Sequence, residues 1–158
     1  MPEVVLREIT RENFSECASL TVEPWQVELV ATNLKSLAEA KIDSALFPFA
    51  IYDRAAVGSP LDRHRMLGFT MLEIRRGVGF IVRLMIDKEH QRKGYGRAAM
   101  VEVIRQLRLH PEVRLIATSH RRKNEAASKL CRELGFRDWG VPWENPDPDE
   151  IYLALQDQ

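Results

Sequence analysis

Short apolar runs alternate along the chain with segments in which apolar residues recur every three or four positions. Short runs are typical of strands, and the wider spacing is typical of helices that pack by one face. The strand-like runs are residues 4–9, 49–53, 66–74, 79–86, 114–119, 136–139 and 151–155. The helix-like segments are residues 10–20, 24–41, 94–107 and 124–134. The order β-αα-β-β-β-α-β-α-β-β predicts an α/β fold with one mixed sheet.

Turn and cap residues divide the chain at the same places. Thr10 is a suitable N-cap for the first helix, and a break is expected in the second near residues 32–33. Gly77 suits a hairpin turn between two strands, and Gly135 would end the last helix. The 158 residues are enough for one hydrophobic core, so a single domain over residues 1–158 is expected.

The charges are balanced over the whole chain but uneven along it. A formal net charge of zero predicts no general attraction to nucleic acid or to an anionic membrane surface. Basic residues crowd positions 75–123, whereas the segment 143–150 is acidic. No stretch reaches the roughly 18 apolar residues that a membrane-spanning helix needs. These features predict a cytoplasmic protein whose middle segment binds an anionic ligand.

The chain has two cysteines, Cys17 and Cys131. They lie far apart and lack metal-ligand spacing, so neither a metal site nor a disulfide framework is indicated. A reducing, intracellular environment is the simpler expectation.

The segment "QRKGYG" at residues 91–96 stands between a strand that ends at Ile86 and a helix that starts near Gly94. A helix start presents unpaired main-chain N–H groups at the positive end of the helix dipole, where phosphate binds well. Gly94 and Gly96 can take positive φ angles, and without Cβ atoms they let the main chain approach phosphate oxygens. Positive charge comes from the neighbouring side chains of Arg92, Lys93 and Arg97. The alternative is an ordinary turn with solvated basic residues.

The letters "GYGRAA" also satisfy the G-x-G-x-x-A form of the dinucleotide-binding fingerprint. Three features count against that interpretation. The segment 87–93 separates the strand from the first glycine, and "ATSHRR" stands where an acidic residue is expected about twenty positions on. The loop also lies in mid-chain after an antiparallel hairpin, whereas the fingerprint normally starts a domain. Affinity for NAD or FAD would be the evidence in its favour.

Residues 91–96 match the Q/R-x-x-G-x-G/A signature of the GNAT-type N-acetyltransferases. A second block, "NEAASKLCRELGF" at residues 124–136, resembles the N-x-x-A-x-x-L-Y-x-x-x-G-F segment that follows the fifth strand of that family. The chain further resembles a bacterial branch of diamine or spermidine N-acetyltransferases. The resemblance covers nearly the whole chain. It implies a mostly antiparallel sheet of about seven strands with about four helices, in which strands four and five splay after about Met85 and around Thr118.

The resemblance also implies that acetyl-coenzyme A is the acetyl donor. Leu84, Met85 and Ile86 would pair through their main chain with the pantetheine arm, and Asn124 would reach the same arm. A main-chain N–H near Ile86 would polarise the thioester carbonyl. The pyrophosphate would be held by the backbone amides of Arg92, Lys93, Gly94, Tyr95, Gly96 and Arg97, in a loop shaped by Gln91.

The candidate catalytic residues are Cys131, Glu73 and His120. Cys131 replaces the family tyrosine that protonates the departing thiolate, and such acid help is typically worth about a hundred- to ten-thousand-fold in rate. Cys131 could donate that proton, could pack as a small core residue, or could take the acetyl group covalently. The base that deprotonates the amine could be Glu73, His120 or a chain of waters. No metal is expected.

The expected activity is transfer of the acetyl group to a primary amine of a small molecule, by direct attack on the thioester. For a polyamine, carboxylates in the segment 143–150 and at Glu23 and Glu28 could bind the substrate, but the hairpin at residues 73–79 is basic. A peptide α-amine, an amino-acid-like amine and an aminated antibiotic are the other candidate acceptors.

The alternative from another class is a non-catalytic sensor that binds acyl-coenzyme A, which the missing tyrosine would suit. Binding without turnover over a broad panel of amines would favour it. Small domains of this kind often form homodimers, although no sequence signal decides for one.

Overall fold

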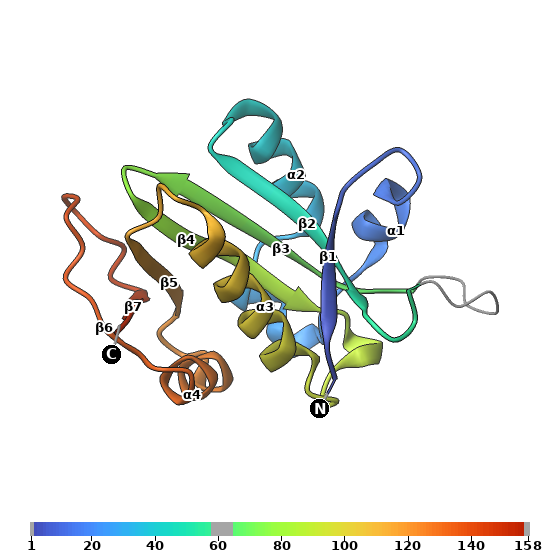
Figure 1. The fold of residues 1–158 in the computed structure, drawn as a ribbon. Coiled ribbons are helices and arrows are strands. Elements are labelled where there is room, and N and C mark those ends of the chain that lie inside the picture. The colour runs from blue at the N-terminus through green and yellow to red at the C-terminus, as the bar shows by residue number, and fades with distance from the viewer. Residues whose placement is uncertain (1, 58–64, 157–158) are drawn as a thin grey trace.

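A single seven-stranded sheet forms the centre of the molecule (Figure 1). The computed structural model describes residues 2–57 and 65–156. The strands are β1 (Val4–Glu8), β2 (Leu46–Asp53), β3 (Met66–Arg75), β4 (Val78–Ile86), β5 (Leu115–Arg121), β6 (Phe136–Asp138) and β7 (Glu150–Leu155). They lie in the order β1-β2-β3-β4-β5-β7-β6, and each neighbouring pair is antiparallel except the parallel pair β4 and β5. The predicted fold class is confirmed.

Helices cover both faces of this sheet (Figure 1). They are the α-helices α1 (Phe14–Ser19), α2 (Asn33–Ile42), α3 (Tyr95–Leu109) and α4 (Glu125–Glu133), and the 3-10 helices η1 (Pro24–Leu29) and η2 (Lys88–His90). Successive residues of a strand point to opposite faces, and Leu72 packs in the cluster of α3 and α4 whereas Met71 packs in that of α1 and α2. Helices α3 and α4 therefore cover one face of the sheet, and α1 and α2 cover the other. Within residues 2–57 and 65–156, no helix is long and apolar enough to cross a membrane.

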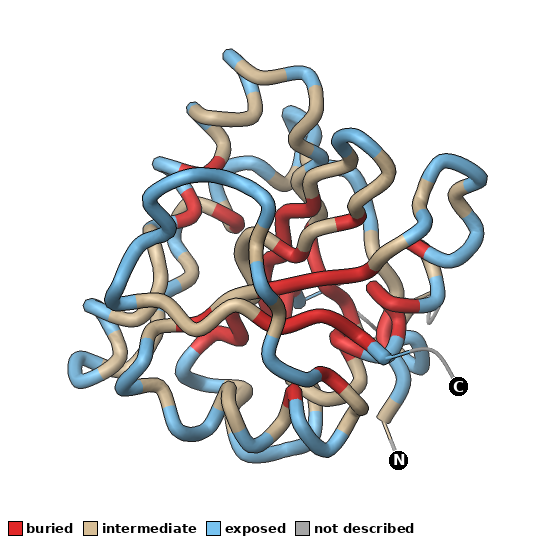
Figure 2. Tube along the Cα trace, turned by 90° about the vertical axis from the view of Figure 1, so that its left-hand side faces the viewer, coloured by how far each residue is buried: buried red, intermediate tan, exposed pale blue. Residues whose placement is uncertain are grey.

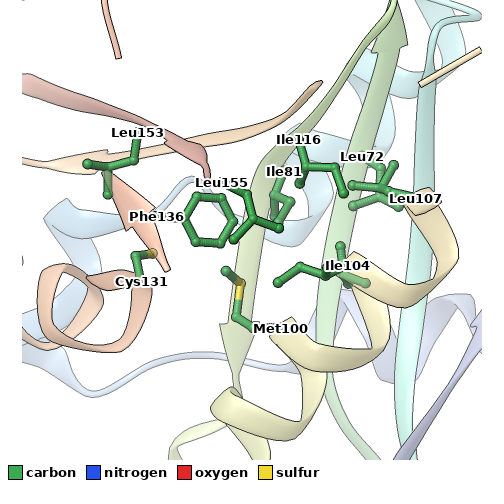
Figure 3. Packing of buried hydrophobic residues seen from close by; sticks show 11 residues of the cluster. Leu72, Ile81, Met100, Ile104, Leu107, Ile116, Cys131, Phe136, Leu153 and Leu155 are labelled. Carbon is green, nitrogen blue, oxygen red and sulfur yellow. The ribbon is translucent and has the colours of Figure 1, made fainter. Parts of the chain in front are cut away.

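The largest buried cluster lies between the sheet and the α3–α4 face (Figure 3). Helix α3 contributes Met100, Val103, Ile104 and Leu107, which follow the helical spacing that the sequence predicts. These side chains meet Ile81 of β4 and Phe136 of β6, and Cys131 of α4 belongs to the same cluster. Figure 2 shows the buried residues gathered in the middle of the molecule, with exposed segments around them.

Helix caps and turns lie at residues whose side chain or backbone freedom suits them. Thr32 caps α2 by accepting a hydrogen bond from the N–H of Lys35 at 3.1 Å. Arg76 and Gly77 both have positive φ angles, which is the geometry of a tight hairpin turn between β3 and β4. Gly135 has a φ of +101° and follows Leu134, the C-cap of α4. The predicted break, hairpin and helix end are thus confirmed.

The first helix starts later than the sequence predicts. Thr10 does not cap it: its Oγ1 accepts from the N–H of Glu12 at 3.3 Å within a turn of residues 10–13, and the residue that precedes the helix is Asn13. Helix α1 then begins at Phe14.

Strand β2 starts earlier than predicted, at Leu46, and includes Pro48. Proline is tolerated there because β1 ends opposite Phe49, so β2 has no second neighbour at Pro48 that would need its N–H.

Strands β4 and β5 separate part-way along their length. Their ladder joins residues 78–81 to residues 115–118 and no others. The pairing of β4 with β3 skips Val82, so β4 carries a bulge there. A bulge bends its strand and increases the local twist, which turns the end of β4 away from β5. The separation begins after residue 118 of β5, as expected, but after Ile81 of β4, earlier than the expected position near Met85.

Candidate active site

A cavity of about 670 Å³ opens where β4 and β5 separate. One end is lined by Met100 of α3 and Cys131 of α4, and the other by residues 27–32, which include the end of η1. Leu84 of β4 and His120 of β5 lie in its wall. The cavity therefore passes through the sheet from one face to the other, and its volume is that of an ordinary ligand site.

The separated end of β4 directs main-chain groups into this opening. The N–H of Asp87 donates to the carbonyl of Leu67 in β3 at 2.8 Å. Because the main-chain groups of a strand alternate in direction, those of Ile86 and Leu84 point away from β3. Leu84 also lines the cavity, whereas Met85 between them is buried in the cluster of α1 and α2. Leu84 and Ile86 thus lie on a strand edge that pairs with no strand of the described residues, although the carbonyl of Ile86 accepts from Nε2 of Gln91 at 2.9 Å.

The loop between β4 and α3 keeps its N–H groups available. Gly94 caps α3 in the left-handed conformation, with a φ of +86°, and Arg92 is left-handed as well, at +63°. The N–H groups of residues 92–94 donate no hydrogen bond within the described part of the chain. The first turn of α3 adds the N–H groups that a helix start leaves unpaired. Together they form an end that suits an anion.

Gly96 differs from what the sequence suggested. It lies inside α3 and its φ is not positive, so that expectation was wrong. A Cβ atom added there would meet only Ile86 Cγ1, at 4.0 Å, among the described residues. Glycine in a helix is about 1 kcal/mol less favourable than alanine, so the fold itself does not call for glycine here. Because Gly96 has no side chain, the N-terminus of α3 stays accessible to a ligand.

Two side chains hold the loop in place. The Nε2 of Gln91 donates to the carbonyl of Ile86 at 2.9 Å and to Oε1 of Gln26 in η1 at 2.8 Å. The hydroxyl of Tyr95 donates to Oδ2 of Asp53 at 2.6 Å, and this hydrogen bond raises the pKa of Tyr95. The loop is therefore tied to β4, η1 and β2.

The basic side chains of the loop lie at the surface. Arg92 and Lys93 are exposed. Nη1 of Arg97 lies 3.1 Å from Oε2 of Glu133, which joins α3 to α4. These three cations surround the helix start with positive charge.

His120 is the cavity residue best suited to accept a proton. Its Nδ1 lies 2.8 Å from the carbonyl oxygen of Arg121, and because a carbonyl can only accept, Nδ1 carries the hydrogen. The lone pair of the neutral ring is then on Nε2, which is buried and has no hydrogen-bond partner in the described structure. A buried basic nitrogen beside a cavity has the geometry of a general base.

Cys131 lines the cavity and also packs near Phe136 and Leu153 (Figure 3). Burial raises the pKa of its thiol to about 11. An ordinary thiol has a pKa of about 8.5, so Cys131 is a weaker acid than the group it would have to protonate. It also holds almost no thiolate at neutral pH, which disfavours a covalent role. Its surroundings favour packing.

Replacing Cys131 with alanine is therefore expected to leave turnover nearly unchanged and to lower the free energy of unfolding by about 1 kcal/mol. Steady-state kinetics and urea unfolding would measure the two effects. Cys17→Ala is the matched control, because Cys17 is also buried, its pKa is also raised to about 11, and it lies outside the cavity lining. A large loss of turnover in Cys131→Ala alone, at normal stability, would identify Cys131 as the acid.

Asn124 and Glu73 take different positions. Asn124 lines the cavity, and its Oδ1 caps α4 by accepting from the N–H of Ala127 at 3.1 Å. Its side-chain amide remains for a ligand. Glu73 lies outside the cavity lining, with Oε2 at 3.5 Å from Nη2 of Arg75 at the surface. The fold thus brings His120, Cys131 and Asn124 together and leaves Glu73 apart.

Glu150 is a cavity residue that the sequence suggested only as one member of an acidic loop. It begins β7, and its Oε2 is buried without a partner among the described residues. Burial raises its pKa, and the positive charge of Arg121 opposes part of that shift. The sequence did hold a sign of this position. Glu150 stands directly before the apolar run 151–155, so it could have been assigned to the strand and not to the loop.

Replacing Glu150 with glutamine should stabilise the folded protein at neutral pH. Because the folded-state pKa is raised above its ordinary value of 4.5, the ionised carboxylate is less favourable in the folded than in the unfolded chain. The advantage of the variant should grow as the pH rises above that value and vanish below about pH 4, where both states are protonated. Urea unfolding of both proteins over a pH series would measure it. A difference that widens towards acid pH would contradict this assignment.

Several solved structures share this architecture. A spermidine N-acetyltransferase from Vibrio cholerae, in complex with CoA and spermine, superimposes with a TM-score of 0.70 at 18% identity, over 96% of this chain and 93% of that chain. The ribosomal-protein-S18-alanine N-acetyltransferase from Escherichia coli gives 0.66 at 17% identity, over 96% and 92%. The PaiA N-acetyltransferase from Thermoplasma acidophilum, in complex with coenzyme A, gives 0.67 at 12% identity, over 98% and 99%. At these identities the likenesses establish the fold alone.

Sequence comparison is more specific at the level of the family. The comparison with curated protein sequences found no match. Residues 6–136, which are most of the chain, match the acetyltransferase (GNAT) family, and the chain therefore belongs to this family of acetyltransferases.

Proposed function

We propose that the protein transfers the acetyl group of acetyl-coenzyme A to the primary amine of a small molecule, by direct attack of the amine on the thioester. Family membership makes the chain an acetyltransferase with acetyl-coenzyme A as its donor. The observation that carries the proposal is the cavity through the sheet, which is lined both by Leu84 on the separated end of β4 and by His120 of β5. Nε2 of His120 is buried and has no hydrogen-bond partner among the described residues.

The residues around the opening suit the donor, whose thioester supplies an electrophilic acyl carbon. The N–H groups of residues 92–97 would hold the pyrophosphate. Support comes from the N–H groups of residues 92–94, which donate no hydrogen bond within the described chain, and from the bare Gly96 at the helix start. Leu84 and Ile86 would bind the pantetheine arm through the main-chain groups that point away from β3. The amide of Asn124, in the cavity wall, would reach the same arm.

The catalytic roles follow from what each residue offers. Nε2 of His120 would take the proton of the substrate ammonium, because only the neutral amine is a nucleophile. The N–H of Leu84 would donate to the carbonyl oxygen as negative charge develops there, since Leu84 lines the cavity and Ile86 does not. Cys131 would complete the apolar wall. A departing thiolate is stable enough in water to leave without it.

The test is a titration of the protein with acetyl-coenzyme A by calorimetry, followed by a thiol-release assay with polyamines, amino acids and short peptides. Binding with thiol release on one class of amine is the expected result. Binding without release over the whole panel would favour the sensor, and an absence of binding would contradict the assignment of the glycine loop.

The cytoplasm is the location that we propose for this activity. Both cysteines, Cys17 and Cys131, are free and buried, as is usual for proteins of a reducing compartment.

A further inference from the structure

We propose that the acceptor carries a carboxylate beside its amine, as an amino acid does, and that polyamines are poor substrates. The inference rests on the proposed acetyl transfer and names its substrate class. It comes from the charged side chains that line the cavity, which are Glu28, Lys35, Arg83, Arg121 and Glu150.

Arg83 is the most enclosed cation of this set, with 18% of its side chain exposed. It directly follows the bulge at Val82, so the sheet fixes its position beside the opening. Its Nη2 lies 3.1 Å from Oε1 of Glu39, yet that oxygen makes no hydrogen bond within the described residues. The contact is an ion pair that engages one end of the guanidinium, which has five N–H donors. The other N–H donors of the guanidinium remain for a ligand, and a carboxylate can accept two of them in parallel.

Two more cations of the cavity keep unused donors. Nη1 of Arg121 lies 3.7 Å from Oδ2 of Asp147, which is too far for a hydrogen bond. Lys35, near the start of α2, makes no side-chain ion pair or hydrogen bond within the described chain. With Arg83 they are three cations in the cavity lining whose remaining N–H donors could bind an anionic group.

The carboxylate that the cavity offers to an ammonium is Glu150. Of the two carboxylates in the lining, Glu28 is already paired, because Nζ of Lys123 lies 2.9 Å from its Oε2. Oε2 of Glu150 is buried without a partner, and Glu150 is paired in register with Arg121 across β5 and β7. Glu150, which can bind an ammonium group, and Arg121, which can bind a carboxylate, are therefore neighbours on adjacent strands.

This charge arrangement discriminates between acceptors. A zwitterion can place its ammonium towards Glu150 and His120 and its carboxylate towards the cations. A polyamine has several positive charges and no negative one, so part of its chain would face Arg83, Arg121 and Lys35. Repulsion between these cations and the positive charges of the polyamine would exclude it, even where one of its amines fits beside Glu150.

The experiment compares amines that differ only by a carboxylate. The pairs are ornithine with putrescine, lysine with cadaverine, and phenylalanine with phenethylamine, with spermidine as an additional probe. Binding is measured by calorimetry on the protein saturated with coenzyme A, and turnover by thiol release with acetyl-coenzyme A. The carboxylated member of each pair should bind about tenfold more tightly or better.

Variants connect this preference to the named cations. Arg83→Gln should reduce the preference for the carboxylated member to near unity, and Lys35→Gln should reduce it by a smaller factor. Lys35 is exposed, so this second variant keeps the test valid if Arg83→Gln does not fold. Arg75→Gln is the matched control, since Arg75 has an ion pair with Asp43 at 2.6 Å and lies outside the cavity lining. It should keep the preference of the unmodified protein.

The outcomes separate the two proposals. Equal or tighter binding of the decarboxylated amines, an absence of binding by all of them, or a preference unchanged in both variants would overturn the zwitterion inference. Turnover of polyamines with normal acetyl-coenzyme A binding would do the same and leave the acetyl transfer intact. A protein that does not bind acetyl-coenzyme A would instead contradict the proposed function itself.

Discussion

Replacing Gly96 with aspartate is expected to give a folded protein whose affinity for acetyl-coenzyme A is at least about a hundredfold lower. The added Cβ would meet nothing closer than Ile86 Cγ1 at 4.0 Å among the described residues, so the fold can accept it. An acidic residue in the first turn of a helix is even favourable for stability, through the helix dipole. The new carboxylate would occupy the place proposed for the pyrophosphate, and it would repel the negative charge of the pyrophosphate. Calorimetric titration and urea unfolding of the variant would measure both effects.

Gly140→Asp is the matched control for this change. A Cβ at Gly140 would meet no atom of the described residues within 4 Å, and Gly140 lies outside the glycine loop and the cavity lining. This variant should bind acetyl-coenzyme A as the unmodified protein does. Normal affinity in a folded Gly96→Asp variant would show that the pyrophosphate does not lie at the start of α3.

Replacing His120 with glutamine is expected to lower kcat by about a hundred- to ten-thousand-fold. Glutamine can still donate to the carbonyl of Arg121, but it has no nitrogen that accepts a proton at neutral pH. Affinity for acetyl-coenzyme A should stay the same, because the proposed contacts to the donor come from β4, the glycine loop and Asn124. Kinetics at saturating amine, together with calorimetry of the donor, would separate the two parameters.

His110→Gln controls for the loss of a histidine as such. His110 follows α3, and its Nδ1 is also buried without a partner in the described structure, but it does not line the cavity. Turnover should be normal in this variant. If His120→Gln were equally active, the proton would have to pass to Glu150 or to water, and the assignment of the base would fall.

Residues that determine their own local conformation made much of the fold predictable. Gly77 and Gly135 have positive φ angles at the predicted turn and helix end, and Thr32 and Asn124 cap helices through their side chains. The glycine loop could be located for the same reason, because a strand, a glycine cap and a helix follow one another within a short segment.

Features that depend on partners distant in the sequence could not be predicted. The bulge at Val82 has no glycine to mark it and exists only in the register with β3, so the splay was expected too late along β4. Glu73 and His120 looked alike as candidate bases, since one dimension does not show which side chain reaches the cavity. Glu150 belongs to the site because β7 inserts between β5 and β6.

The parallel ladder between β4 and β5 also determines when the site can exist. Parallel strands need a crossover connection, and here α3 supplies it between residues 78–81 and 115–118. A fragment that ends with β4 contains Leu84 but not His120, and a fragment that starts with β5 contains His120 but lacks the glycine loop. Neither part of the chain holds both walls of the cavity, so during synthesis the cavity is absent until the second half of the sheet has docked onto the first.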